Sequence, residues 1–289
     1  MPELPEVETI RRDLEAEVVG RTITSVSTDW PKTVADPPFE LFEGLLPGKK
    51  IKAIKRRAKN LIIELDGQYL LIHFKMTGHM IVADASKLHK DHWDEADSSS
   101  NLADRVNQFI HLVFYLDDGR VMALSDLRKF ARVRLFAKEQ LDEHLSGLGP
   151  EPLEAGFTFK VFKEQLAGKK GAIKKILLEQ DVISGIGNIY ADEILFESRI
   201  APQRLVPDLK ENELKAIYDN IRKVLAKAVK LRGTSTSDFR DASGAKGEFT
   251  EVRKVYRRTG EPCPNNCGGL ITRMKIAGRS SHYCPNCQK

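Results

Sequence analysis

The first eight residues, which read MPELPEVE, hold two prolines and three carboxylates. If Met1 is removed, Pro2 becomes a free secondary amine. An α-amino group titrates near pH ~8, so part of it is neutral and nucleophilic at working pH. Such an amine can attack a sugar carbon to give an iminium, and Glu3 beside it can carry protons. The opening therefore predicts Schiff-base chemistry with Pro2 as the nucleophile.

The same stretch has a structural interpretation as the start of a helix. Proline is favoured in the first helical turn, and carboxylates are favoured near the positive end of the helix dipole. Pro5 and Glu6 suit those positions, and Gly20 suits the end of the helix. Between them runs an apolar stripe at helical spacing, formed by Val7, Ile10, Leu14 and Val18. We expect both interpretations to hold together.

Length and composition describe a multidomain globular protein. The chain has 289 residues, of which 41% are hydrophobic and 30% are charged, enough for two or three domains. The sequence shows neither an apolar run of membrane-spanning length nor a signal peptide before the charged N-terminus. We therefore expect a cytoplasmic protein without a membrane partner.

The net charge of +5 is unevenly distributed. Residues 1–159 carry −5, whereas residues 160–289 carry +10. A basic half is typical of proteins that bind a polyanion, most simply nucleic acid. Basic surfaces also serve solubility, so the charge alone does not choose between the two.

All four cysteines lie in the last 27 residues, in two close pairs separated by 16 residues. This clustering differs from the disulfide framework of a secreted protein and is typical of a metal site. Four thiolates predict one tetrahedral Zn²⁺ with no open coordination position, so the metal is structural. The predicted ligands are Cys263, Cys267, Cys284 and Cys287.

The pattern of apolar residues predicts an α+β multidomain protein. Residues 21–136 read mostly as short strands separated by turns, which favours a β-sandwich flanked by helices. The polar stretch 84–107 reads as a long surface loop, and its His89 and His92 as solvated rather than metal-binding. Glycines and prolines at 147–152 mark a linker, and helical periods follow over 159–166, 173–177 and 214–231.

These signals divide the chain into three predicted domains. Residues 1–146 form the sandwich, 147–252 a helical domain, and 253–289 a zinc-finger β-hairpin. Residues 233–250 are rich in Gly, Ser and Thr and read as a flexible loop of the helical domain.

Several motifs together resemble one family. Residues 2–9, PELPEVET, are similar to the opening of bacterial formamidopyrimidine-DNA glycosylases, which excise oxidised purines. The sister branch, endonuclease VIII, usually opens with Pro-Glu-Gly-Pro, so Leu4 favours the purine branch. Residues 126–130 (DLRKF), 183–193 (ISGIGNIYADE) and the cysteine pairs arrive in the family's order. The resemblance covers essentially the full chain.

The resemblance implies roles for residues of the predicted sandwich. Lys59 ends a basic run that could be a solvated turn; by resemblance it contacts phosphate and assists acid–base steps. His73 matches a histidine that binds backbone phosphate, and Glu6 is expected to position the N-terminus. Base chemistry requires the nucleotide to leave the stack, and the side chains expected to fill the gap are Met76, Arg128 and Phe130.

It also implies roles in the basic half of the chain. Glycines before a helix that opens with Asn188 let backbone N–H groups approach an anion, and we expect Asn188 both to cap that helix and to bind phosphate. Lys174 matches another phosphate-binding position. Arg279, between the cysteine pairs, matches the zinc-finger arginine that acts with Pro2, Glu3 and Lys59. The loop 233–250 matches the family's lesion-capping lid.

Two departures from the family pattern stand out. Lys129 and Ala131 replace an arginine and a glycine, which stiffens the loop. The first cysteine pair has three intervening residues instead of two, so that knuckle must bulge.

The resemblance implies a monomeric bifunctional DNA glycosylase and AP lyase of base-excision repair, acting on 8-oxoguanine and formamidopyrimidines in double-stranded DNA in the bacterial cytoplasm. An enzyme for oxidised pyrimidines would share everything but the lesion pocket. A zinc-ribbon DNA sensor without catalysis would need the cysteines but not Pro2, Glu3 and Lys59. A ribosome- or polymerase-associated zinc ribbon explains less of the chain.

Overall fold

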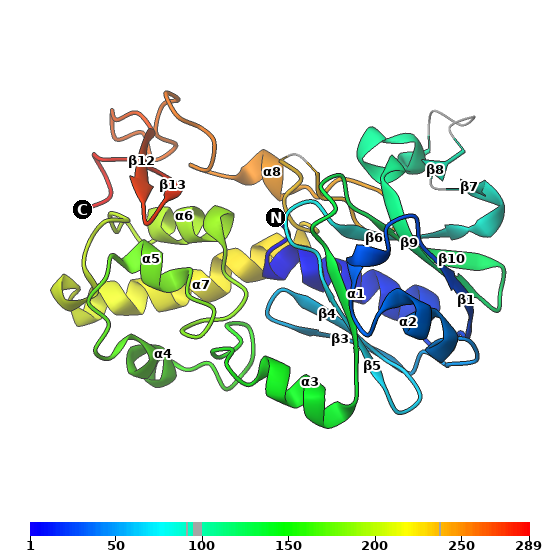
Figure 1. Ribbon diagram of the computed structural model, residues 1–289. Coiled ribbons are helices and arrows are strands. Elements are labelled where there is room, and N and C mark those ends of the chain that lie inside the picture. Colours follow the sequence, from blue (N-terminus) through cyan, green and yellow to red (C-terminus); the bar gives the residue numbers. More distant parts are fainter. Residues whose placement is uncertain (91, 95–99, 237) are drawn as a thin grey trace. The chain divides into compact units, whose positions relative to one another are not determined.

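The computed structural model describes residues 1–90, 92–94, 100–236 and 238–289. The chain forms two compact units (Figure 1). The first unit comprises residues 1–146 and 231–250, and the second comprises 147–230 and 251–289. Residues 233–250, assigned by sequence to the helical domain, therefore pack in the first unit. The three-domain division of the chain stays a prediction.

The first unit is built on two antiparallel-rich sheets. One sheet has the order β1-β9-β10-β6 and the other the order β2-β11-β5-β4-β3. The strands of the unit are β1 Ile23–Ser27, β2 Val34–Asp36, β3 Ala53–Arg57, β4 Asn60–Glu64, β5 Tyr69–His73, β6 His79–Asp84, β7 Leu88–His89, β8 His92–Trp93, β9 Ile110–Leu116, β10 Arg120–Ser125 and β11 Arg132–Phe136.

One apolar core joins the two sheets to the first helix, α1 (Leu4–Val18). Phe114 of β9 and Leu70 of β5 contribute from opposite sheets, and the predicted stripe of α1 packs into the same core. Two further helices, α2 (Phe39–Leu45) and α3 (Lys138–Leu145), complete the unit. The predicted sandwich with a packed N-terminal helix is confirmed.

The expectation of a solvated loop over 84–107 is wrong for much of that stretch. Its β7 and β8 form a hairpin, and Trp93 is fully buried in a second apolar cluster with Ile110 and Val113. A large indole gains more by leaving water than a polar stretch loses by ordering. Residues 91 and 95–99 of the stretch lie outside the described residues.

The second unit contains the predicted helices. They are α4 (Phe159–Leu166), α5 (Ile173–Leu177), α6 (Asn188–Glu197) and α7 (Glu211–Lys230), and the short α8 (Phe249–Val252) lies where the chain re-enters the unit. The hairpin of β12 (Thr272–Ile276) and β13 (Arg279–Tyr283) follows. In the described part of the chain, no helix combines the length and apolar character that a membrane crossing requires.

Candidate active site and nucleic-acid interface

Pro2 and Glu3 lie in a buried segment that Glu6 holds. Pro2 is buried, and Glu3 is only 2% exposed. The backbone N–H of Glu3 donates to Glu6 Oε2 at 2.8 Å, and that of Thr234 donates to Glu6 Oε1 at 2.7 Å. One carboxylate thus fixes both the start of α1 and the segment after α7. This arrangement supports the expected positioning role of Glu6.

Gly233 shows why the segment can approach so closely. A Cβ at this position would lie 2.8 Å from Glu6 Oε1, and φ is +79°, which disfavours other residues. Further along, Asn107 Nδ2 donates to the carbonyl of Gly244, and Val82 N donates to that of Ala242. The described residues of 233–250 are therefore anchored at three points, in contrast to the flexible loop that composition predicted. Ser237 lies outside the described residues.

Lys59 lies in the tight turn between β3 and β4, and is 6% exposed. Arg56 ties this turn to α1: its Nε donates to Glu8 Oε2 at 3.1 Å, and its Nη1 donates to the carbonyl of Ala58 at 3.0 Å. Ala58 has a φ of +54°, so the turn adopts a left-handed conformation that these contacts stabilise. The turn that carries the predicted lysine is thus fixed to α1.

His73, at the end of β5, is a neutral hydrogen-bond donor. Its Nδ1 accepts from the backbone N–H of Lys75 at 3.0 Å, so the ring proton sits on Nε2. Burial, together with the positive charges of Lys75 and Lys59, lowers the pKa of His73 to about 4. An uncharged Nε2–H can donate to a phosphate oxygen throughout the neutral pH range.

The lowered pKa predicts a pH-dependent stability. Between pH 6.5 and 4 the unfolded chain binds a proton at His73 that the folded chain does not, so stability falls as the pH falls. The loss should reach about 3 kcal/mol near pH 4. The free energy of unfolding, measured with denaturant between pH 7 and pH 4, should fall more steeply with falling pH for the wild type than for His73→Gln. The same pH dependence in both proteins would contradict this prediction.

The three predicted gap-filling side chains lie together in the first unit. Arg128 Nη1 contacts Met76 Sδ at 3.0 Å, and its guanidinium stacks over the Phe130 ring with 4.7 Å between Cζ and the ring centroid. Met76 and Phe130 are 42% and 43% exposed. Exposed apolar side chains gathered at one place mark a binding surface.

Asp126 holds the loop that carries Arg128 and Phe130. Its Oδ2 accepts from the backbone N–H groups of Phe130 and Ala131, both at 2.7 Å. Its Oδ1 accepts from the Thr77 hydroxyl, which joins the loop to the turn that carries Met76. Ala131 keeps this geometry in place of the family's glycine.

In the second unit, two of the expected phosphate-binding residues, Asn188 and Arg279, line one cavity of about 500 Å³. Asn188 opens α6 there, while Arg279 begins β13 after a two-residue turn. Gly187 occupies the N-cap, so the expectation that Asn188 caps the helix is wrong. Its Oδ1 is buried without a hydrogen-bond partner among the described residues. Sequence analysis missed the other lining residues, Tyr256, Arg257, Arg273, Ser280 and His282.

Lys174 does not face this cavity as a phosphate ligand would. It is fully buried, and its Nζ lies 2.6 Å from Asp192 Oδ1 and donates to the carbonyl of Ser280 at 2.7 Å. Asp192 in turn accepts from the backbone N–H of His282 at 2.9 Å. These contacts make Lys174 a positioning residue for the strand that begins with Arg279.

Glu193, beside Asp192, anchors the segment that carries Tyr256. Its carboxylate accepts the backbone N–H groups of Lys254, Val255 and Tyr256 at 2.7–2.9 Å. Burial raises the pKa of Glu193, and the three N–H groups oppose this shift. The signal in the sequence was two adjacent carboxylates inside an otherwise apolar helix.

Breaking the buried ion pair should destabilise the second unit. Replacing Lys174 by methionine leaves Asp192 charged and buried without its counter-ion, which costs about 3–5 kcal/mol. Lys175→Met is the matched control, since Lys175 is exposed on the same helix. Equal free energies of unfolding for the two variants would contradict this ion-pair role.

The four cysteines form one structural zinc site. Their Sγ atoms all lie within 4.8 Å of one another, and the Cys263–Cys287 and Cys267–Cys284 pairs are 3.6 Å and 3.4 Å apart. These separations suit a tetrahedral ion with Zn–S bonds of ~2.3 Å. The long first knuckle turns at Asn266, whose φ is +53°, so the extra residue is absorbed in a left-handed turn.

Family models match three consecutive parts of the chain. Residues 1–133 match the formamidopyrimidine-DNA glycosylase N-terminal domain, and residues 148–240 match the H2TH domain of the same glycosylase. Residues 260–289 match a zinc finger found in FPG and IleRS.

Full-length relatives agree with these matches. Formamidopyrimidine-DNA glycosylases of Heliobacterium modesticaldum and Herpetosiphon aurantiacus are 42% and 43% identical, each over 100% of both chains. A complex of Lactococcus lactis Fpg with abasic-site DNA is 35% identical, covers 99% of each chain and has a TM-score of 0.87. A second Lactococcus complex, with N7-benzyl-Fapy-dG DNA, is 36% identical over 100% of both chains, also at 0.87. Because the family models, the full-length relatives and the fold all agree, the chain belongs to the formamidopyrimidine-DNA glycosylase family.

Proposed function

We propose that this protein is a bifunctional DNA glycosylase and AP lyase that removes oxidised purines, such as 8-oxoguanine and formamidopyrimidines, from duplex DNA. The observation that carries the proposal is the burial of Pro2 and Glu3: both are withdrawn from solvent, and Glu6 accepts the backbone N–H groups of Glu3 and Thr234. A nucleophile and its proton carrier need such fixed positions. The Lactococcus complexes with abasic-site and Fapy-dG DNA support this substrate class.

In the proposed reaction, the Pro2 amine attacks C1′ of the deoxyribose and the damaged base leaves. Glu3 protonates the sugar ring oxygen, and the ring opens to an iminium. Successive β- and δ-elimination then cut the strand on both sides of the sugar. Removal of Met1 is a requirement, because the nitrogen of an internal proline is an amide.

The remaining site residues bind and bend the duplex. Lys59, His73, Asn188 and Arg279 clamp phosphates around the lesion, and Lys59 assists the proton transfers. The contacting side chains Met76, Arg128 and Phe130 enter the space left by the flipped nucleotide. Lys174 acts through Asp192 and the zinc-finger hairpin. We further propose that the enzyme repairs nucleoid DNA in the bacterial cytoplasm.

The test is covalent trapping. Purified protein is incubated with a duplex that holds one 8-oxoguanine opposite cytosine, and borohydride is added to reduce any iminium. Peptide mapping then locates the attachment, and mass spectrometry shows whether Met1 is absent. An adduct at Pro2 is the expected result.

Two other outcomes would overturn the proposal in different ways. Trapping only on an oxidised pyrimidine would move the protein to the sister branch. Tight DNA binding without trapping on either lesion, in protein whose Pro2 amine is exposed by Met1 removal, would favour a non-catalytic sensor.

A further inference from the structure

The loop that carries Arg128 and Phe130 contains a residue in an unfavourable backbone conformation. Lys129, between them, has a φ of +57°. This lies in the left-handed region, which residues other than glycine rarely adopt. Its backbone N–H donates to the carbonyl of Asp126 at 3.1 Å. This local reversal of the chain allows the guanidinium of Arg128 to stack on the ring of Phe130. The presentation of both side chains therefore depends on the conformation of Lys129.

The side chain of Lys129 is held by a distant segment of the same unit. Its Nζ lies 3.7 Å from Asp29 Oδ2 and 4.7 Å from the centroid of the Trp30 ring. A second ammonium, that of Lys32, lies 5.5 Å from the same ring centroid. Ammonium groups are attracted to the face of an indole, but only Lys129 belongs to the loop.

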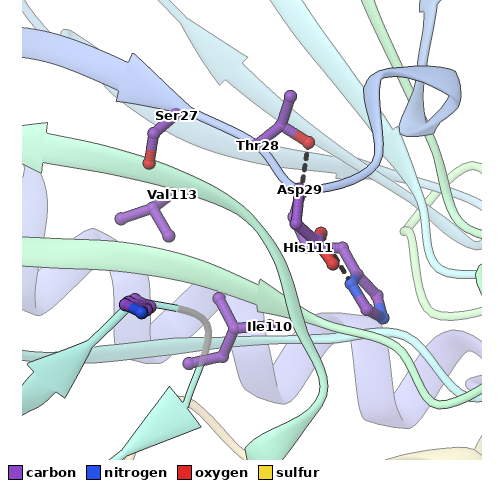
Figure 2. Close-up of a pocket in the computed structure, with 7 residues that line it drawn as sticks. Ser27, Thr28, Asp29, Ile110, His111 and Val113 are labelled. Carbon is purple, nitrogen blue, oxygen red and sulfur yellow. Dashed lines mark hydrogen bonds and ion pairs between the residues drawn. The ribbon is translucent and has the colours of Figure 1, made fainter.

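The segment that receives Lys129 is itself anchored on β9. The Nδ1–H of His111, a buried ring, donates to Asp29 Oδ1 at 2.8 Å (Figure 2). The hydroxyl of Thr28 donates to the backbone carbonyl of His111 at 2.5 Å and accepts the backbone N–H of Trp30 at 3.0 Å. One hydrogen bond thus fixes the Asp29 carboxylate, and two fix the backbone from Thr28 to Trp30, without any contribution from Lys129.

We propose that Asp29 and Trp30 form a support that holds Lys129 in its left-handed conformation and so sets how Arg128 and Phe130 meet the base opposite the lesion. The inference rests on the proposed insertion of Arg128 and Phe130 into the duplex. Lys129, Asp29 and Trp30 are positioning residues, because they act through Arg128.

The expected effect is moderate and specific. An exposed cation–π contact and a partly exposed ion pair are each weak, so losing them changes how often the loop is correctly formed rather than whether it forms. Lys129→Met should lower the preference for 8-oxoguanine opposite cytosine over adenine, measured as the ratio of kcat/KM values, by about fivefold. Lys129→Arg, which keeps both contacts, should restore the ratio.

Lys32→Met is the matched control. It removes an ammonium from the same Trp30 ring and the same charge from the protein, but it does not touch the loop. Trp30→Leu should show part of the effect of Lys129→Met, because it removes the cation–π contact and leaves the ion pair with Asp29. The double variant should be no worse than Lys129→Met alone, because Lys129→Met already removes both contacts. Fluorescence of 2-aminopurine beside the opposite base gives an independent readout of insertion.

The outcomes separate this inference from the proposed function. If Arg128→Ala collapses the preference while Lys129→Met matches Lys32→Met, the support has no such role and the proposed function stands. Additive effects of Trp30→Leu and Lys129→Met would also overturn the inference. If Arg128→Ala changes neither the preference nor the fluorescence, the insertion role fails, and the inference fails with it.

Discussion

Glu3→Gln is expected to lower the rate of base excision about 10³-fold, the middle of the range for removal of a general acid–base group. Glutamine has the same shape as glutamate but cannot carry the proton that opens the sugar ring. Glu3 is almost completely buried, so water cannot readily reach the same position to replace it. Single-turnover excision of 8-oxoguanine measures the effect, and the affinity for duplex DNA should be nearly unchanged.

Two further variants test whether the loss of rate comes from the carboxylic acid of Glu3. Glu15→Gln makes the same substitution in α1, the helix that Glu3 precedes, at a half-exposed site that pairs with Arg11, and it should excise at the wild-type rate. Glu3→Asp keeps the carboxylic acid on a side chain that is one methylene shorter, which moves the acid away from the sugar. An intermediate rate is expected. If Glu3→Gln excised as fast as Glu15→Gln, Glu3 would have no role in proton transfer.

Cys284→Ser is expected to abolish stoichiometric zinc binding and to weaken DNA binding by at least about 100-fold. Structural zinc sites bind their ion with about 10–16 kcal/mol, and this free energy is also folding free energy. Cys284 is fully buried in the cluster that contains Phe196 and Val255, so the hairpin of β12 and β13 should lose its order. That hairpin carries Arg279, which explains why DNA affinity should fall with the metal. Zinc content and DNA binding are measured on the same preparation.

Cys287→His is the companion variant. A Cys₃His set is an ordinary structural zinc site, and Cys287 is only partly buried, so the larger ring has room. This variant should keep one zinc per chain and most of its DNA affinity. A Cys284→Ser protein that still bound one zinc with unchanged affinity would show that the four cysteines are not the metal site.

Several features followed from the sequence because they depend on neighbouring residues. Helical spacing located α4, α5 and α7, and two cysteine pairs located the zinc site, since these patterns are read within a few residues of chain. The opening PELPEVET and the DLRKF loop identified the family and the candidate chemistry. The strands near 61–65, 69–74 and 110–116 were also close to those observed.

Other features depend on contacts between residues far apart in the chain, which no local pattern encodes. The pairing of Lys174 with Asp192 turned an expected phosphate ligand into a buried support, because only the fold brings a carboxylate to that lysine. The contact of Thr234 with Glu6 helps to hold residues 231–250 in the first unit, whereas the sequence had assigned residues 233–250 to the helical domain. The hold of Asp29 and Trp30 on Lys129 likewise joins residues about 100 positions apart. The sequence by itself determined which side chains the chemistry requires; only the tertiary structure decided which partners hold them, because burial and pairing are properties of the packed chain.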